Sequence, residues 1–560
     1  MNPITLQNIA QALWMKEYDA AKIPPGVLER IQSAVNSEAA YAKRFLQRLQ
    51  QLEENPLSFV PGRAERYALL RQHLQQTSAM SPREFYASCL FLGEESNAGY
   101  APVPLDPSFP FPQTDLPQLQ HQLGWHFFVG NFTDARGHHY SIELMFWQYA
   151  LLPPPLAAEL GLSDIENQSL EMHLAICDPQ TGQQYRANTV VVAGTTGLVE
   201  VGSAPFVYRI GHNAIEGLKP GGDLFPVRLQ ARGWDMGKPA DVEFGIDISL
   251  ENAKGYFMQG DEGCSPSIDG LGTLYYSASL LKLLPGAANV ITIDGRRIEL
   301  TDGSMWYDHQ WTAGFMPKGG ARHAVLRAAS NLAAAPPGGW DWFEVQFQAG
   351  MAPGLGEVQM TISALHTLDN AQFYWQTGAT PPGTMTARFN GKYIDAGNVT
   401  ANLSGTMAVT AWVKDATSPN PGVYPATHTW YPAHYHFSLD PQLPGTGPAV
   451  PQRLRTFTLE PLIGTGQSGF FGTGLQYTEG GAIARDLAGA EIGRGFAEGT
   501  NWAHSADTVV AAAGLVASEQ TRALLTPVPP SAQLVVDSMA YTQENALELL
   551  AIMKSARGMV

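Results

Sequence analysis

The spacing of apolar residues changes along the chain and predicts three kinds of region. Between residues 5 and 95, apolar side chains recur every three to four positions, as in residues 27–35 and 41–52, which predicts amphipathic helices. From Gly124 to about Trp502, short alternating segments recur every eight to fifteen residues between Gly, Pro, Asn and Asp, which is typical of β-strands joined by turns. After residue 504 the helical spacing returns on both sides of Pro527.

The alternating segments predict a mainly β protein built as a barrel or a sandwich. The predicted strands include residues 125–132, 140–146, 171–177, 188–192, 225–231, 242–250, 290–293, 343–347, 358–364 and 435–439. Prolines between Pro102 and Pro112 exclude a regular helix there. The predicted division is an α-helical domain at 1–100, a Pro-rich linker at 101–118, β domains at 119–330 and 331–503, and C-terminal helices at 504–560.

Composition narrows the classes of partner. The net charge is −17 and charged residues make up only 15 % of the 560 residues, so a basic face for nucleic acid is not expected. The three cysteines have no CxxC spacing, which predicts neither a disulfide framework nor a thiolate metal site. The chain shows no leader pattern and no apolar run of about 18 residues, so we expect a cytoplasmic protein without a membrane span.

The densest group of reactive and aromatic side chains lies at residues 303–311. Signatures of serine hydrolases, zincins, NTPases, kinases and dinucleotide enzymes do not occur in the chain, so no cofactor is expected. In a regular strand, Trp306, Asp308 and Gln310 would share one face, and Tyr307, His309 and Trp311 the other. A carboxyl among aromatic side chains in a barrel interior would be desolvated and kept protonated near neutral pH, as a general acid requires. The alternative is a structural Asp308 that accepts hydrogen bonds from turn amides.

Two further groups invite a functional interpretation. His434 and His436 would share a strand face and offer two metal ligands, but the tyrosines and tryptophan between and before them favour a barrel wall, so no metal is predicted. Glu479 and Glu498 lie in apolar, glycine-rich strands and could act as a second acid or base. The preferred interpretation of these two is a structural ion pair with Arg485 or Arg494.

Six motifs, taken in order, resemble the family that joins the carotenoid hydratases (CrtC, hydroxyneurosporene synthase) to the AttH-type tandem lipocalin-like proteins. The resemblance covers about residues 120–502. Its motifs are residues 124–132 with the turn 134–137, 260–263 before Tyr275, Tyr276 and Ser277, the signature 306–311, Trp340 to Phe343, residues 477–480 and residues 493–498. Gln310 stands where the family has an acid or Asn, His126 where a second Trp is usual, and Gly124 where a Glu is usual.

The resemblance implies two lipocalin-like antiparallel β-barrels around a cavity for an apolar, isoprenoid- or polyene-like molecule. It also implies cofactor-independent chemistry, namely hydration or dehydration of a carbon–carbon double bond, isomerisation or cyclisation. The aspartate of its signature is Asp308, which the resemblance makes the proton donor. Substrate contacts are expected from side chains at motif positions or in neighbouring aromatic strands, with His309 as a reserve base: Trp306, Gln310, Trp311, Tyr275, Tyr276, Trp125, Trp340, Trp342, His434 and Glu479.

Two alternatives remain open from the sequence. A pericyclase would shape a polyene for reaction by proximity, without needing an acid. A lipocalin-like carrier would sequester an apolar ligand without changing it. The sequence does not specify the substrate or the oligomeric state.

Overall fold

The computed structural model describes residues 100–500, apart from 105–106, 151–153, 160–162, 194–198, 236–241, 267–271, 313–338, 351–355, 367–382, 415–429, 441–449, 464–467 and 472–475. This part of the chain is mainly antiparallel β-structure, as predicted, with one short helix, α6 (Pro154–Glu159), and two 3₁₀ turns, η2 (Gln113–Asp115) and η5 (Gln452–Leu454). The helical ends predicted at 1–100 and 504–560 fall outside it, except for Tyr100. No helix in the described part has the length and hydropathy that a membrane crossing requires.

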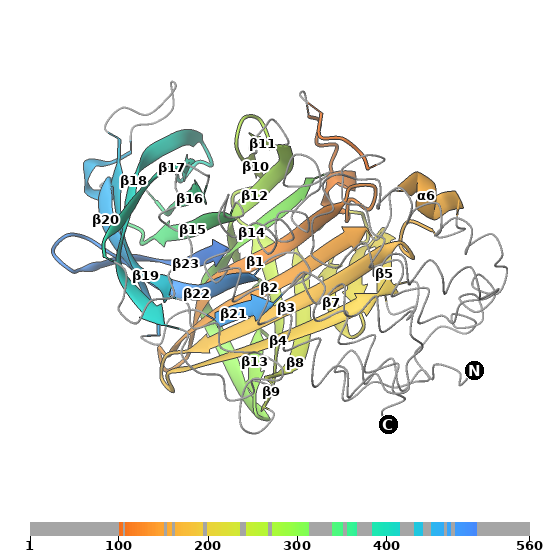
Figure 1. Ribbon diagram of the computed structural model, residues 1–560. Helices are drawn as coiled ribbons and strands as arrows, with labels where there is room; N and C mark the ends of the chain where they lie inside the picture. Colours follow the sequence, from red (N-terminus) through yellow and green to blue (C-terminus); the bar gives the residue numbers. More distant parts are fainter. Residues whose placement is uncertain are drawn as a thin grey trace, which may run out of the picture.

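The first sheet contains fourteen strands and occupies the centre of Figure 1. They are β1 (Leu123–Asp134), β2 (His139–Ala150), β3 (Gln168–Asp178), β4 (Gln183–Val192), β5 (Val199–Ser203), β6 (Phe206–Ile210), β7 (Asn213–Gly217), β8 (Val227–Asp235), β9 (Val242–Asn252), β10 (Phe257–Met258), β11 (Cys264–Pro266), β12 (Gly272–Leu283), β13 (Val290–Ile293) and β14 (Arg296–Thr312). Their main order is β4-β3-β2-β1-β14-β12-β9-β8-β7-β6-β5. The sheet curls so that β4 reaches β8, where the Arg186 amide donates to Asp235 Oδ2 over 3.4 Å.

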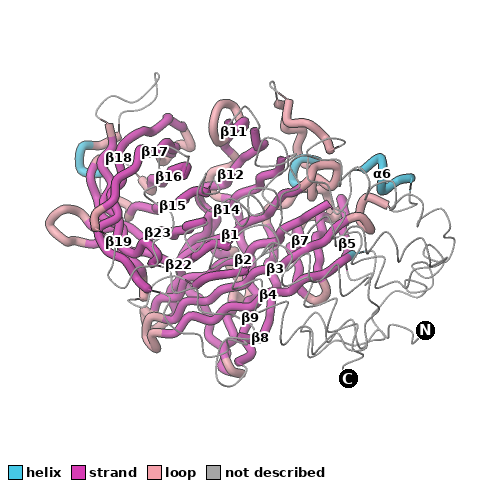
Figure 2. Tube along the Cα trace, viewed as in Figure 1, coloured by secondary structure: helices cyan, strands magenta, loops and turns pink. Residues whose placement is uncertain are grey.

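The second sheet contains nine strands, at the left of Figures 1 and 2. They are β15 (Gly339–Phe347), β16 (Val358–His366), β17 (Met385–Ile394), β18 (Thr400–Lys414), β19 (Trp430–Leu439), β20 (Thr456–Pro461), β21 (Ser468–Phe471), β22 (Gln476–Arg485) and β23 (Glu491–Thr500). Pairing of β20 with β22 closes this sheet into a barrel. Burial alternates along β18, and the inward residues such as Leu403, Met407 and Val409 form the barrel core.

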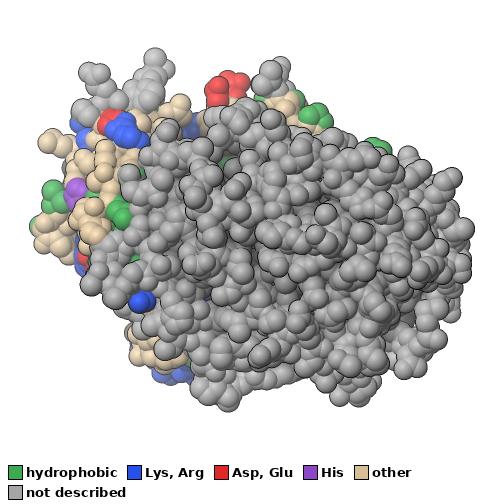
Figure 3. All heavy atoms as spheres, in the orientation of Figure 1, with side chains coloured by type: hydrophobic (Ala, Val, Ile, Leu, Met, Phe, Trp, Pro, Cys, Tyr) green, Lys and Arg blue, Asp and Glu red, His purple; other side chains and the backbone are tan. Residues whose placement is uncertain are grey.

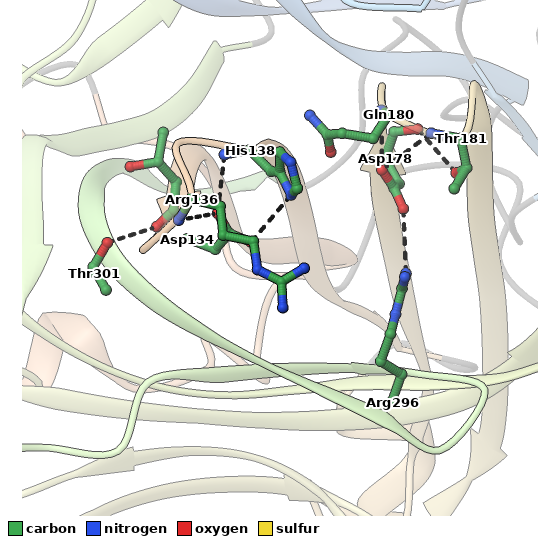
Figure 4. Close-up of polar contacts among 9 residues, drawn as sticks. Asp134, Arg136, His138, Asp178, Gln180, Thr181, Arg296 and Thr301 are labelled. Atoms are coloured by element: carbon green, nitrogen blue, oxygen red, sulfur yellow. Dashed lines mark hydrogen bonds and ion pairs between the residues drawn. The ribbon is translucent and has the colours of Figure 1, made fainter.

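The turns at one end of the first sheet are held by local polar contacts (Figure 4). Asp134 accepts from the amides of Arg136 and His138 over 2.8 and 2.9 Å and closes the β1–β2 hairpin. The side chain of His138, which follows this turn, is 41 % exposed. Gly137 supplies the left-handed φ of 77° that this turn needs.

The two sheets pack against each other along β1, β2 and β14 on one side and β15, β22 and β23 on the other. One apolar cluster draws on both sheets, with Phe127 and Trp306 from the first and Trp342 and Phe496 from the second. Asn131 Nδ2 also donates to the Gly495 carbonyl over 3.1 Å. Strands at this contact are therefore buried on both faces, as the nearly unbroken burial of β1 shows.

The Pro-rich segment before β1 also packs on the first sheet. Its η2 turn is followed by chain that packs on the first sheet, and the Asp115 side chain at the end of η2 is 1 % exposed. Tyr256 donates to both carboxylate oxygens of Asp115, and Tyr276 donates to one of them. The predicted linker thus contributes a buried acid to the first sheet.

Candidate active site

The strand β14 carries the signature residues, and alternation divides them as the sequence predicts. Asp308 is opposite Phe127 of β1 and Ser277 of β12, while His309 is opposite His126 and Tyr276. Residues opposite each other in an antiparallel sheet share a face. Asp308 therefore shares a face with Trp306, and His309 points away from it.

The face that carries Asp308 is not the interior of its own sheet, contrary to the expectation from sequence. Trp306 packs edge-on against Trp342 of the second sheet, with ring centroids 6.1 Å apart. The interior face carries Tyr307 instead. The centroid of its ring lies 4.7 Å from that of Phe128 and 5.5 Å from that of Phe225. Both faces of β14 are buried from Met305 onwards, so hydrophobicity alone could not distinguish the barrel interior from the contact between the sheets.

Three side chains donate hydrogen bonds to the Asp308 carboxylate. Tyr275 Oη reaches Oδ2 over 2.5 Å, Trp306 Nε1 reaches Oδ1 over 2.6 Å, and Ser277 Oγ also donates to Oδ1. The Tyr275 hydroxyl in turn accepts from Trp342 Nε1 over 3.1 Å. The acid is thus held rigidly by groups of its own sheet and linked through Tyr275 to the second sheet.

Burial raises the pKa of Asp308 to about 7, although the hydrogen bonds from Ser277, Tyr275 and Trp306 lower it. The side chain is 3 % exposed, so water cannot compensate for the loss of solvation. A carboxyl with this pKa carries its proton in about half of the molecules at neutral pH. Such a group can give a proton to an apolar molecule and take one back.

Further buried carboxyls lie near Asp308 from the second sheet and from β2. Burial raises the pKa of Glu498 to about 8, opposed chiefly by the hydrogen bond from Trp340 Nε1 at 2.6 Å. Burial also raises the pKa values of Glu344, Glu479 and Glu143 well above their usual range, with repulsion from neighbouring carboxylates as the second cause. This part of the protein is consequently rich in carboxylic acids that stay neutral.

The preferred interpretation of Glu479 and Glu498 as arginine partners is wrong. Arg485 pairs with Glu460 over 3.1 Å, and Arg494 pairs with Glu491 over 2.9 Å. Both arginines satisfy their charge near the surface, which leaves the glutamates among other acids. Among the described residues, no group of three or more His, Cys, Asp or Glu side chains is placed to hold a metal ion.

The contact between the sheets brings together most of the predicted substrate contacts. Trp125 stacks on Trp147 with centroids 4.9 Å apart and belongs to the same apolar cluster as Trp306, Trp342 and Trp340. Tyr275 and Glu479 face this region as well. Gln310 lies further along β14, where its Nε2 donates to Thr273 Oγ1 over 2.6 Å.

The remaining predicted residues lie elsewhere. Tyr276 and His309 belong to the interior face of the first sheet, where Tyr276 Oη lies 3.2 Å from His309 Nδ1 and 2.5 Å from Asp115 Oδ1. Trp311 shares that face, with its ring 4.7 Å from His309. Burial lowers the pKa of His309 well below its usual value, which keeps the ring neutral. His434 is half-buried on β19, on the opposite face from the core residue Tyr435, and the structure does not bring it to Asp308.

Sequence reasoning gave no functional role to four buried polar residues, of which only Ser277 stands in one of the six motifs: Asp115, Ser277, Glu344 and Glu143. Ser277 and Glu344 follow aromatic motif positions by two residues and could have been found by alternation. Asp115 carries no comparable signal, since it is a single acid in a Pro-rich segment far from its tyrosine partners in sequence. Glu143 lies in an apolar strand, where a single acid indicates either a carboxylate in an ion pair or a functional site.

One family model and two solved structures are similar to this chain. Residues 102–358 match the family model described as AttH-like, which confirms the resemblance stated from the sequence. A crystal structure of a proposed AttH from Nitrosomonas europaea aligns with a TM-score of 0.50 and 17 % identity, covering 72 % of this chain and 99 % of that one. Kievitone hydratase from Nectria haematococca aligns with a TM-score of 0.42 and 14 % identity, covering 73 % of this chain and 97 % of that one. Comparison with curated proteins gives no match.

Proposed function

Starting from a chain whose residues 102–358 match the AttH-like family, we propose that the contact between the two sheets is the active site of a cofactor-independent, acid-catalysed enzyme. Its substrate is an apolar isoprenoid- or polyene-like molecule, and its reaction is hydration, dehydration, isomerisation or cyclisation. The observation that carries the proposal is a buried Asp308 whose pKa lies near neutrality, among tryptophan rings.

In the hydration direction, neutral Asp308 gives its proton to one carbon of a double bond, and the other carbon becomes a cation. A water oxygen then bonds to that carbon, and the proton it loses returns to the Asp308 carboxylate. The sum is the addition of one water, and dehydration is the reverse. Loss of a proton from a neighbouring carbon gives an isomer instead, and attack by a second double bond closes a ring.

The cation needs stabilisation from groups that do not react with it. Aromatic faces provide this by cation–π attraction of about 2 kcal/mol for a desolvated ring. Trp306, Trp342 and Trp340 lie in the apolar cluster next to Asp308. Neutral carboxyls such as Glu344 add no nucleophilic anion while they keep their protons.

The test compares wild-type protein with Asp308→Asn and with a matched control, Asp294→Asn. Asp294 is exposed, and its φ of 50° in the β13–β14 turn is one that Asn also adopts. Each protein is incubated in H₂¹⁸O and D₂O with isoprenoid alcohols (geraniol and farnesol), with the corresponding acids (geranic and farnesoic acid) and with an extract of apolar metabolites, and products are identified by mass spectrometry. We expect the wild type and Asp294→Asn to incorporate label, and Asp308→Asn to bind the same compounds with turnover reduced by orders of magnitude.

Two results would refute acid catalysis. Equal turnover by Asp308→Asn would favour the pericyclase, which needs the shape of the site and no proton. Stoichiometric recovery of an unchanged ligand from both proteins, with no labelled product, would favour the carrier.

A further inference from the structure

A solvent-open cleft of about 290 Å³ lies where the two sheets diverge, at the far end of the contact that contains Asp308. Its walls come from the end of β1, the middle of β14 and the end of β12 in the first sheet, and from β15, β16 and β23 in the second. Figure 1 shows these strands side by side, while the described surface visible in Figure 3 mixes apolar, basic, acidic and polar side chains. What sets the cleft apart from this surface is the group of polar side chains that line it.

Three polar side chains form a row across the second-sheet wall. Gln346 of β15 is opposite Gln359 of β16 on one side and opposite Arg494 of β23 on the other. Such cross-strand neighbours have Cβ atoms about 4.5–5.5 Å apart on one face of the sheet. All three line the cleft.

Hydrogen bonds to the other polar atoms of these side chains fix their orientation. Gln359 Oε1 accepts a hydrogen bond from Lys254 Nζ over 2.7 Å, and Gln346 Oε1 accepts one from Ser304 Oγ. Arg494 Nε donates to Glu491 over 2.9 Å, and its Nη2 lies 3.0 Å from His139 Nε2.

One N–H donor group is left over on each member of the row. Gln359 Nε2, Gln346 Nε2 and Arg494 Nη1 are buried and have no hydrogen-bond partner among the described residues. The Gln359 side chain as a whole is 0 % exposed. A buried donor without a partner costs free energy, so a row of three indicates a site for acceptor oxygens.

We propose that this row binds a carboxylate at the end of the substrate, so that the substrate is an apolar acid and not a neutral hydrocarbon or alcohol. A carboxylate has two oxygens with about four acceptor positions and can bridge neighbouring donors. Hydrogen bonds in which one partner is charged are about twice as strong as neutral ones. The inference names the substrate class of the proposed active site and rests on that function.

The charges of the cleft favour a single negative charge over a phosphate or diphosphate. Lys282 pairs with Glu357 over 2.8 Å, and Arg494 pairs with Glu491, so both cations are already compensated. Asp302 adds an exposed negative charge to the lining. A polyanion would meet repulsion here that three N–H donors without hydrogen-bond partners cannot offset.

The cleft and Asp308 belong to one continuous layer between the sheets. On β15, Gln346 shares its face with Glu344 and Trp342, and on β14 Ser304 shares its face with Trp306 and Asp308. Four residues along a strand span about 13 Å. A carboxylate at Gln346 would therefore direct an apolar chain of that length towards Trp342 and Asp308.

The experiment measures binding of dodecanoate, 1-dodecanol and dodecyl phosphate to the full chain by quenching of tryptophan fluorescence. The variant is Gln346→Met, which keeps the length of the side chain and removes its donors. The matched control is Gln230→Met on β8, a half-buried glutamine outside the cleft. Urea unfolding of both variants checks that they are folded.

We expect wild type and Gln230→Met to bind dodecanoate at least tenfold more tightly than 1-dodecanol or dodecyl phosphate. In Gln346→Met the affinity for dodecanoate falls about tenfold, roughly 1.4 kcal/mol, while that for 1-dodecanol is unchanged. Equal affinities for acid and alcohol, tighter binding of dodecyl phosphate, or an unchanged Gln346→Met would each overturn the carboxylate assignment.

Asp308→Asn separates this inference from the proposed catalysis. The variant should bind dodecanoate as wild type does, because the row of donors is intact. If turnover is independent of Asp308 but dodecanoate still prefers the row, the catalytic proposal fails and the binding site stands. If turnover requires Asp308 but acid and alcohol bind alike, only the carboxylate site fails.

Discussion

Asp308→Asn tests the premise of the proposed chemistry through stability, without any knowledge of the substrate. The folded chain raises the pKa of Asp308 from an ordinary value of 3.8 to about 7. The folded state therefore binds this proton more tightly than the unfolded state. The resulting stabilisation is fully present below pH 3.8 and is lost as the pH rises through 7.

The size of the effect follows from the two pKa values. One pKa unit corresponds to about 1.4 kcal/mol, and between pH 5 and pH 9 the folded group loses a proton that the unfolded group has already released. Asp308 should therefore make wild type about 2.7 kcal/mol less stable at pH 9 than at pH 5. Asparagine does not titrate, so Asp308→Asn lacks this loss.

The assay is urea unfolding of both proteins at pH 5, 7 and 9, read by fluorescence and circular dichroism. The quantity of interest is the difference in unfolding free energy between variant and wild type at each pH. Contributions of titrating groups that do not interact with Asp308 largely cancel in this difference. Loss of the Asp308 charge also lowers the pKa values of Glu344 and Glu498, which shifts the difference in the same direction. We expect it to move in favour of the variant by about 2.7 kcal/mol from pH 5 to pH 9. A difference that stays constant across this range would mean that Asp308 is an ordinary ionised carboxylate, and the reasoning would be refuted.

Three further changes test other parts of the site. Tyr275→Phe removes a hydrogen bond that lowers the pKa of Asp308. The pKa of Asp308 should therefore rise, and in a pH–rate profile the pH at which activity falls by half should move upwards. An unchanged profile would contradict this role of Tyr275. Glu498→Gln removes an acid whose pKa is about 8. In urea unfolding, the free energy of unfolding of this variant relative to wild type should rise by about 2.7 kcal/mol from pH 6 to pH 9. An unchanged difference would contradict a neutral Glu498. Gly130→Ala places a Cβ against the Ser304 carbonyl between β1 and β14 and should lower the unfolding free energy by about 1–3 kcal/mol, whereas wild-type stability would show that the strands can separate there.

Much of the secondary structure was predictable because it follows from alternation and turn chemistry, which are local. The ten predicted strands lie in or overlap strands of the structure, and the Asp134 turn forms the hairpin that its residues indicate. The division of β14 into an Asp308 face and a His309 face was also predictable, since a period of two leaves no other arrangement in a regular strand.

The sequence by itself determined which residue types could form an acid site, namely the aspartate of the signature, the acids in apolar strands and the tryptophans around them. Tertiary structure alone decided which buried face holds Asp308, because the second sheet covers the outer side of β14 and makes both faces equally apolar. It also decided the partners of Arg485 and Arg494, and it brought Asp115 to Tyr276 across the chain. The physical reason is that local pattern records whether a side chain is buried, whereas the pKa and the hydrogen bonds of a buried acid depend on side chains that only packing brings near it.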